Sequence, residues 1–477
     1  MIKKTTIESA ALSFARIDGI LATATKLGRK DMYKTFITNI FKDMTKITPD
    51  CEFGLLWNAA TEKNSKEVFK ELTLDQGNNI VIQADSGGLQ EITLGKPFTP
   101  AEKQGIYKRQ ALYSTRAMSF DKMPIIVDHS KTTSAVDLSN RYFVLDLLYD
   151  CGRESGANVV KQCEVFLDTP DRISKIMVIL QGHTFEDYKE YARGVFSVFD
   201  ELDEETRQKY YSVIGGLSFG LGGTSNYFNL LEVIVRTPME MDFVPEELRS
   251  EIHFLGLGGL TKAAFIYALQ PDFYGRDVHF TFDSTSRTSA ATYGRYTLHD
   301  KEKKTKQVKS TGRDYGENAQ EFLTLLYENF KENINRDLPY RQVHSLEDYR
   351  QKFSAFREDG HRTAKEMKKQ GCDEPFIDDV RLGGTLMSDF VHWLYETKVF
   401  MNILQDFSEG NFTYLSNKKL AEILNAVKEV PTYEEYMLPK NRGYYKLVLE
   451  KIRVSDINII QSESDIEHLS PPVLDEW

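Results

Sequence analysis

Polar residues and glycines stand at or near the ends of a series of apolar runs in the middle of the sequence. The two members best suited to acid–base chemistry are Asp85, in NIVIQADSGG (79–88), and Asp283, in VHFTFDST (278–285). The other members of the series are Asp121, Gln181, Gly216 and Gly256. A single carboxylate in such a place more commonly caps the next helix than moves a proton. Six such positions together predict a functional site built from several segments of the chain.

The segment Asp85-Ser86-Gly87-Gly88 has the composition of a ligand-binding turn. Two consecutive glycines let backbone N–H groups approach a flat ligand closely, because no Cβ intervenes. The alternative is that these four residues form only a strand-to-loop turn.

Seven apolar runs predict strands that are buried on both faces, as in a parallel sheet. They are 54–61, 79–88, 117–128, 175–183, 210–220, 251–259 and 278–285. Helical patterns lie between them, with helix-start signals at Thr99-Pro100-Ala101-Glu102 and at Thr184 with Asp187. Alternating strands and helices in this number predict an α/β protein, a TIM (β/α)₈ barrel. The carboxyl ends of its strands would open on one face, where barrels build active sites.

Composition bounds the protein's class. The chain has 477 residues, with 60 Lys and Arg against 71 Asp and Glu, a net charge of −11. Any contact with nucleic acid must therefore use a local basic patch. The four cysteines have no metal-type or disulfide-type spacing, and the chain shows neither a secretory signal nor an apolar run of membrane-spanning length. These features predict a cytoplasmic protein that does not enter membranes.

The character of the sequence changes after residue 300. DKEKKTKQVKSTGR (300–313) is basic and lacks periodicity, whereas 317–330 and 386–407 have helical patterns. The last stretch, 462–477, has five acidic residues and no Lys or Arg, which is typical of a solvated tail.

Two regions follow from this pattern. Residues 1–410 are predicted to form the catalytic barrel, with a basic and helical insertion at about 300–375. Residues 411–477 are predicted to form a C-terminal helical extension that ends in the acidic tail.

Six motifs in order resemble those of the queuine/archaeosine tRNA-guanine transglycosylases, which are TIM barrels. They are Asp85-Ser86-Gly87-Gly88-Leu89-Gln90, Ser119-Phe120-Asp121, Leu180-Gln181-Gly182, Ile214-Gly215-Gly216-Leu217, Phe254-Leu255-Gly256-Leu257-Gly258 and Phe282-Asp283-Ser284. The likeness covers roughly residues 50 to 290. It implies a pentosyltransferase that exchanges a guanine for a 7-deazaguanine.

The chain also departs from that family. The family's zinc site has several cysteines and a histidine after the nucleophile, whereas here only Cys372 follows, and Ser388 stands at the histidine position. Leu89 replaces the usual aromatic, and no C-terminal RNA-binding domain is evident. The chain therefore most resembles the DNA-modifying branch of phage and bacterial enzymes, which insert preQ0 or a derivative. No metal or other cofactor is expected.

The resemblance gives each motif residue a role. Asp283 would be the nucleophile that forms a covalent glycosyl–enzyme at the sugar C1′, and Asp85 the general acid/base. Asp121 would accept from the guanine edge, and Gln181 with the backbone of Gly216 and Leu217 would meet O6 and the 7-substituent. The remaining substrate-binding residues are Leu89 and Leu255, which sandwich the ring, with Ser86, Gly87 and Gly256.

Phosphate binding is expected from basic residues after the nucleophile motif. They are Arg287, Arg295, Lys301, Lys303, Lys304, Lys306, Lys309 and Arg313. The alternative is a solvated loop with no ligand. The histidines near strand ends, His129, His183, His253 and His279, lack metal-ligand spacing and are interpreted as structural.

The expected partners are DNA with its target guanine flipped out and the free 7-deazaguanine base, with a homodimer left open. Three other functions compete: the same exchange on tRNA, a non-catalytic paralogue that only binds nucleic acid, and an unrelated barrel enzyme for a small molecule.

Overall fold

A computed structural model describes most of the central region of the chain and parts of both ends. The described residues are 2–9, 18, 21–31, 33–35, 37–38, 53–60, 66–74, 80–88, 91, 97–125, 144–220, 226–257, 259–284, 295–299, 305–309, 345, 371, 400, 403–415 and 417–452.

The central sheet is parallel and closes on itself. Its strands are β1 (Ile2–Ser9), β2 (Phe53–Asn58), β3 (Ile80–Asp85), β4 (Arg116–Met118), β5 (Lys175–Gln181), β6 (Ile214–Gly220), β7 (Glu251–Leu255) and β8 (Val278–Ser284). They pair in chain order, and β8 pairs with β1. The predicted α/β class is therefore confirmed, and each of the seven apolar runs contains a strand.

One strand, β1, was not predicted. Its sequence, IKKTTIES, has four consecutive polar residues and no apolar run. Its place is set by pairing with both β2 and β8, a contact between distant segments that local sequence does not encode.

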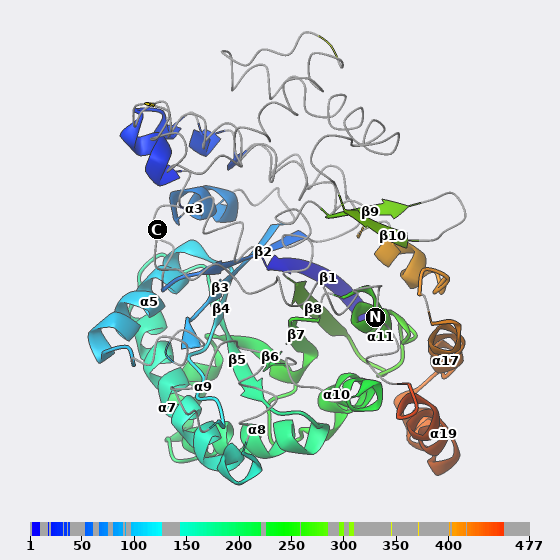
Figure 1. Ribbon diagram of the computed structural model, residues 1–477. Coiled ribbons are helices and arrows are strands. Elements are labelled where there is room, and N and C mark those ends of the chain that lie inside the picture. The colour runs from blue at the N-terminus through cyan, green and yellow to red at the C-terminus, as the bar shows by residue number, and fades with distance from the viewer. Residues whose placement is uncertain are drawn as a thin grey trace.

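Helices surround the strands, as Figure 1 shows. They are α3 (Lys66–Leu74), α5 (Pro100–Tyr113), α7 (Leu148–Leu167), α8 (Phe185–Asp200), α9 (Glu204–Tyr211), α10 (Tyr227–Glu240) and α11 (Leu260–Tyr267). Both predicted helix starts are confirmed as capping boxes, Thr99 with Glu102 in α5 and Thr184 with Asp187 in α8.

Side chains of β2, β3, β4, β5 and β7 alternate between two apolar regions. Those that face the helices belong to the main core, as when Trp57 of β2 stacks on Phe69 of α3 with ring centroids 5.3 Å apart. A smaller cluster contains Leu56, Met118 and Ile179, with Val81 and Leu255 packed against it. These five residues come from five strands and alternate with the helix-facing ones, so they lie on the inner face of the closed sheet.

A two-stranded hairpin follows β8. It consists of β9 (Arg295–His299) and β10 (Thr305–Lys309), which pair antiparallel. Part of the basic stretch that the sequence predicts to be irregular is therefore a strand.

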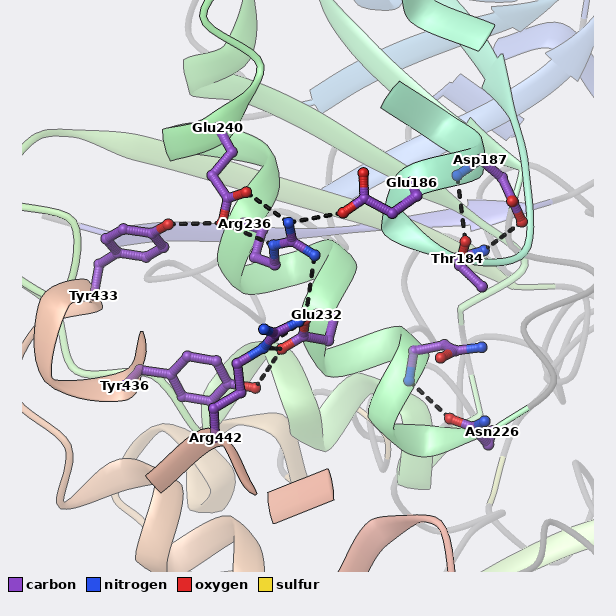
Figure 2. A network of polar contacts seen from close by, with 11 residues as sticks. Thr184, Glu186, Asp187, Asn226, Glu232, Arg236, Glu240, Tyr433, Tyr436 and Arg442 are labelled. Atoms are coloured by element: carbon purple, nitrogen blue, oxygen red, sulfur yellow. Dashed lines mark hydrogen bonds and ion pairs between the residues drawn. The ribbon is translucent and has the colours of Figure 1, made fainter. Parts of the chain in front are cut away.

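Three helices of the C-terminal extension are described: α17 (Lys418–Lys428), α18 (Tyr433–Met437) and α19 (Pro439–Leu449). Figure 2 shows how α18 and α19 join α10 through the buried Glu232. The hydroxyl of Tyr436 donates to Glu232 Oε1 at 3.0 Å, and the Arg442 Nε donates to both carboxylate oxygens at 3.1 and 3.0 Å. A second link joins Tyr433 to Glu240, at 2.7 Å.

The predicted helix 317–330 and the acidic tail 462–477 lie outside the described residues, as does most of 386–407. Among the described helices, none combines the length and the hydropathy needed to cross a bilayer.

Candidate active site at the carboxyl ends of the strands

The structure brings most of the predicted site residues to one end of the sheet. Asp85 is the last residue of β3, Gln181 the last of β5, and Asp283 the last but one of β8. Asp121 follows β4 by three residues, and Gly256 directly follows β7. Parallel strands end on the same side, so the five positions share one mouth.

Asp85 lies in an environment that favours its neutral form. Its pKa is raised from 3.8 to about 6, chiefly by burial and to a smaller extent by the negative charges of Asp121 and Asp283, against hydrogen bonds from the backbone of Gly87 and Ser86. The three acidic side chains come from the same end of the sheet, where the negative charges of Asp121 and Asp283 disfavour ionisation of Asp85. A carboxyl group with a pKa near 6 can gain and lose a proton close to neutral pH.

The carboxylate of Asp85 also receives a side-chain donor. Asn58, the last residue of β2, donates from Nδ2 to Asp85 Oδ2 at 3.3 Å, while its own Oδ1 accepts from the Ala60 N–H. Asn58 is thus held at both ends of its amide and fixes one oxygen of Asp85.

Asp121 and Gln181 form a second polar pair. Gln181 Nε2 donates to Asp121 Oδ2 at 2.6 Å, and burial raises the pKa of Asp121. A Cβ added at Gly88 would lie 2.7 Å from Asp121 Oδ1, so glycine at this position leaves room for the carboxylate. The pair offers an acceptor and an amide side by side, a combination suited to the donor-and-acceptor edge of a purine.

Asp283 faces the inside of the sheet and is 3% exposed. Its neighbour Phe282 belongs to the main core that packs on the helices, so the two side chains point to opposite faces. The backbone N–H of Gly256 donates to Asp283 Oδ1. Gly256 has φ +69°, a left-handed conformation that glycine adopts without strain.

An apolar surface lies beside these carboxylates. Leu255 is partly exposed and packs on the inner cluster of Leu56, Met118 and Ile179. It pairs in register with Gly220 and directly precedes Gly256, so it can contact a flat ring held near Asp283.

The DSGG turn is built tightly. Ser86 is fully buried, and its hydroxyl accepts from the Gly88 N–H at 3.4 Å, while Gly87 has φ +85°. Leu89 and Gln90, which complete the motif, lie outside the described residues.

Two predicted residues are not at the mouth. Gly216 is the third residue of β6, and a Cβ there would clash with the carbonyl oxygen of Glu251, the first residue of β7. Leu217 is fully buried in the main core and pairs with strands on both sides, which engage its backbone. The expectation that they lie at the end of this strand is wrong, because the strand extends to Gly220.

Gly220 occupies the place expected for Gly216. It pairs in register with Gln181, and a Cβ there would lie 2.5 Å from Gln181 Oε1. Gly220 is the last glycine of the run 210–220, and that position could have identified it. The prediction used the earlier pair, Gly215 and Gly216, instead.

Sequence reasoning also missed Asn58 and assigned His253 only a structural role. Asn58 is the first polar residue in the first run, GLLWNAAT, and stands where β2 ends. His253 is fully buried on β7, and its Nε2 lies 3.9 Å from Asp283 Oδ2.

The basic residues are described in part. Arg295, Lys306 and Lys309 belong to the β9–β10 hairpin, where Lys309 is the register partner of Arg295. Arg287, Lys301, Lys303, Lys304 and Arg313 lie outside the described residues.

No group of three or more metal-ligating side chains occurs in the part of the chain that the structure describes. Cys372 and Ser388 lie outside that part, so the loss of the zinc site stays a prediction. In comparisons with known proteins, no protein-family model matches the chain and no curated protein does.

Proposed function

We propose that this protein is a base-exchange transglycosylase, built on a TIM (β/α)₈ barrel, that replaces guanine in DNA with a 7-deazaguanine. The observation that carries the proposal is the position of Asp85 and Asp283 at the same end of a parallel sheet, one at the end of β3 and the other near the end of β8. The motif resemblance and the paired Asp121 and Gln181 support the choice of a purine.

In the first step, a carboxylate oxygen of Asp283 attacks C1′ of the flipped-out nucleotide and the bond from C1′ to N9 breaks. Asp85, with a pKa of about 6, gives its proton to the departing guanine. The enzyme then holds the sugar as an ester of Asp283, and Asp85 is ionised.

In the second step, Asp85 takes the N9 proton of the incoming 7-deazaguanine, whose N9 attacks C1′. The bond from C1′ to Asp283 breaks, and the electron pair returns to the carboxylate. Two displacements at the same carbon restore the original anomer, and the proton count of the enzyme is unchanged.

Incorporation of labelled 7-deazaguanine tests this function. Single-stranded DNA, duplex DNA and tRNA are each incubated with the protein, and the nucleosides are analysed by mass spectrometry. We expect label in DNA, and its loss in Asp85→Asn and Asp283→Asn.

The matched control is Asp168→Asn, which alters an exposed carboxylate at the opposite end of the strands and should incorporate normally. Label found only in tRNA would show that tRNA, and not DNA, is the acceptor. Incorporation by Asp283→Asn at the normal rate would exclude the covalent route.

A further inference from the structure

A row of polar side chains crosses the inner face of the sheet directly below the mouth. Ser218, His253 and Thr281 are register partners across β6, β7 and β8. Each lies two residues before a mouth position, respectively Gly220, Leu255 and Asp283. All three row residues are fully buried, where an unneeded polar group is costly.

His253 is held at one ring nitrogen and aimed at Asp283 with the other. Nδ1 lies 2.9 Å from Thr281 Oγ1, whereas Nε2 has no hydrogen-bond partner among the described residues and lies 3.9 Å from Asp283 Oδ2. The unpartnered nitrogen therefore faces the proposed nucleophile.

The contacts of Thr281 bear on the tautomer of His253. Arg116 donates to Thr281 Oγ1 at 3.3 Å, so one lone pair of that oxygen is occupied. The hydroxyl proton can go to His253 Nδ1 at 2.9 Å or to the Ile252 carbonyl at 3.4 Å, and the shorter contact is to the ring. If Nδ1 accepts, the ring proton is on Nε2 and points at Asp283.

Two further observations favour this arrangement. The opposite tautomer would place the bare lone pair of Nε2 against a carboxylate in a buried site. In addition, burial lowers the pKa of His253 and outweighs the contact with Asp283 and its negative charge, which raise it, while Arg116 lowers it by a smaller amount, so the neutral ring is favoured.

The base of the row is itself anchored. Arg116 contacts Glu251 Oε2 at 3.1 Å, and His279 Nδ1 lies 2.8 Å from the same oxygen. Thr281 is thus fixed by a charged cluster, which limits the rotation of its hydroxyl and of the ring that it holds.

We propose that His253 is a positioning residue for Asp283: its Nε2–H faces Oδ2 while the Gly256 N–H donates to Oδ1, so that an N–H group is directed at each carboxylate oxygen. The role rests on the proposed function for what Asp283 does. The Nε2–H dipole stabilises the charge that returns to the carboxylate when the glycosyl bond breaks. His253 touches neither substrate.

Kinetics give the first test. In His253→Leu, we expect the kcat for base exchange to fall about 10- to 100-fold while the KM for the 7-deazaguanine changes less than about twofold. His253→Gln, whose amide can present an N–H toward Asp283, should recover most of the loss. Thr281→Val should be impaired, and Thr281→Ser should not. An equal loss of kcat in His253→Leu and His253→Gln, or no loss in either variant, would overturn the proposal.

Nitrogen NMR of the histidine-labelled protein gives a test that needs no activity. The His253 signals, identified among nine histidines by their absence in His253→Gln, should show a neutral ring with the proton on Nε2. Asp283→Asn should shift Nε2, and Thr281→Val should shift Nδ1. A proton on Nδ1, or an Nε2 signal that does not shift in Asp283→Asn, would refute the positioning role of His253. A wild type that shows these signals but exchanges no base would instead refute the proposed function.

Discussion

At the scale of single residues, the site depends on how each carboxylate is surrounded. Asp85 is raised in pKa by burial and by two neighbouring acids, whereas Asp283 receives a backbone N–H and faces an imidazole. Two carboxyl groups in different surroundings can take different roles in one reaction, one as proton carrier and the other as nucleophile.

The raised pKa of Asp85 predicts a pH dependence. In the second step the base form of Asp85 is the ionised one, so the rate at which the 7-deazaguanine attacks the glycosyl–enzyme should rise with pH up to about 6 and level off above it. Below that point, kcat/KM for the 7-deazaguanine should fall about tenfold per pH unit, because it reports the ionisation of the glycosyl–enzyme that the free base attacks. Rates measured from pH 4.5 to 8 check this. A rate that stays constant down to pH 5 would contradict the assignment of Asp85 as the base.

Gly256 and Gly275 form a matched pair for testing the donor to Asp283. Both have positive φ, +69° and +65°, and a Cβ at either would meet no atom of the described residues within 4 Å. Substitution by Ala should cost each variant about 1–2 kcal/mol of unfolding free energy, because the left-handed conformation is strained for Ala. Only Gly256→Ala should lose exchange activity, by about tenfold or more, since relief of the strain moves the N–H away from Asp283. Equal activity in the two variants would exclude that role for the Gly256 N–H.

At the scale of elements, most of what places the site was predictable, because buried parallel strands are apolar runs with a polar residue at the end. Asp85, Gln181 and Asp283 are found where their runs predicted. Gly216 was wrongly expected at the end of its strand. An apolar run indicates that a strand is present, but it does not indicate the residue at which pairing with the neighbouring strands ends. β1 was not predicted because its polar residues form no apolar run. Its place in the sheet comes only from its pairing with β2 and β8.

Among the elements, α10 carries the attachment of the C-terminal helices. Tyr436 is fully buried and donates to Glu232, so Tyr436→Phe should lower the unfolding free energy by about 1.5–3 kcal/mol, as for a hydrogen bond to a charged group. Tyr444→Phe is the control, because Tyr444 is 53% exposed and should change the stability by less than about 0.5 kcal/mol. Urea unfolding of both variants measures the difference. Equal unfolding free energies of the two variants would show that the hydrogen bond from Tyr436 to Glu232 does not stabilise the fold.

At the scale of the whole molecule, an acidic chain must bind an acidic polymer through a restricted surface. The net charge is −11, and the β9–β10 hairpin brings Arg295 and Lys309 into register soon after the proposed nucleophile. We propose this hairpin as part of the phosphate-binding surface, together with the basic residues around it in the sequence.

The salt dependence of DNA binding tests the hairpin. The double variant Lys306→Ala/Lys309→Ala should bind DNA more weakly and reduce the slope of log K against log salt by about 2, because each lysine is expected to neutralise one phosphate. Lys446→Ala, on an exposed position of α19, should leave the slope unchanged. An unaltered slope in the double variant would assign these lysines to a solvated hairpin.

The most direct measurement of the central claim is the intact mass of the protein after incubation with a guanine-containing oligonucleotide and no free base. The account predicts a covalent species equal to the chain plus the oligonucleotide less one guanine, attached at Asp283 and absent in Asp283→Asn. No such species, or one attached at a different residue, would contradict it.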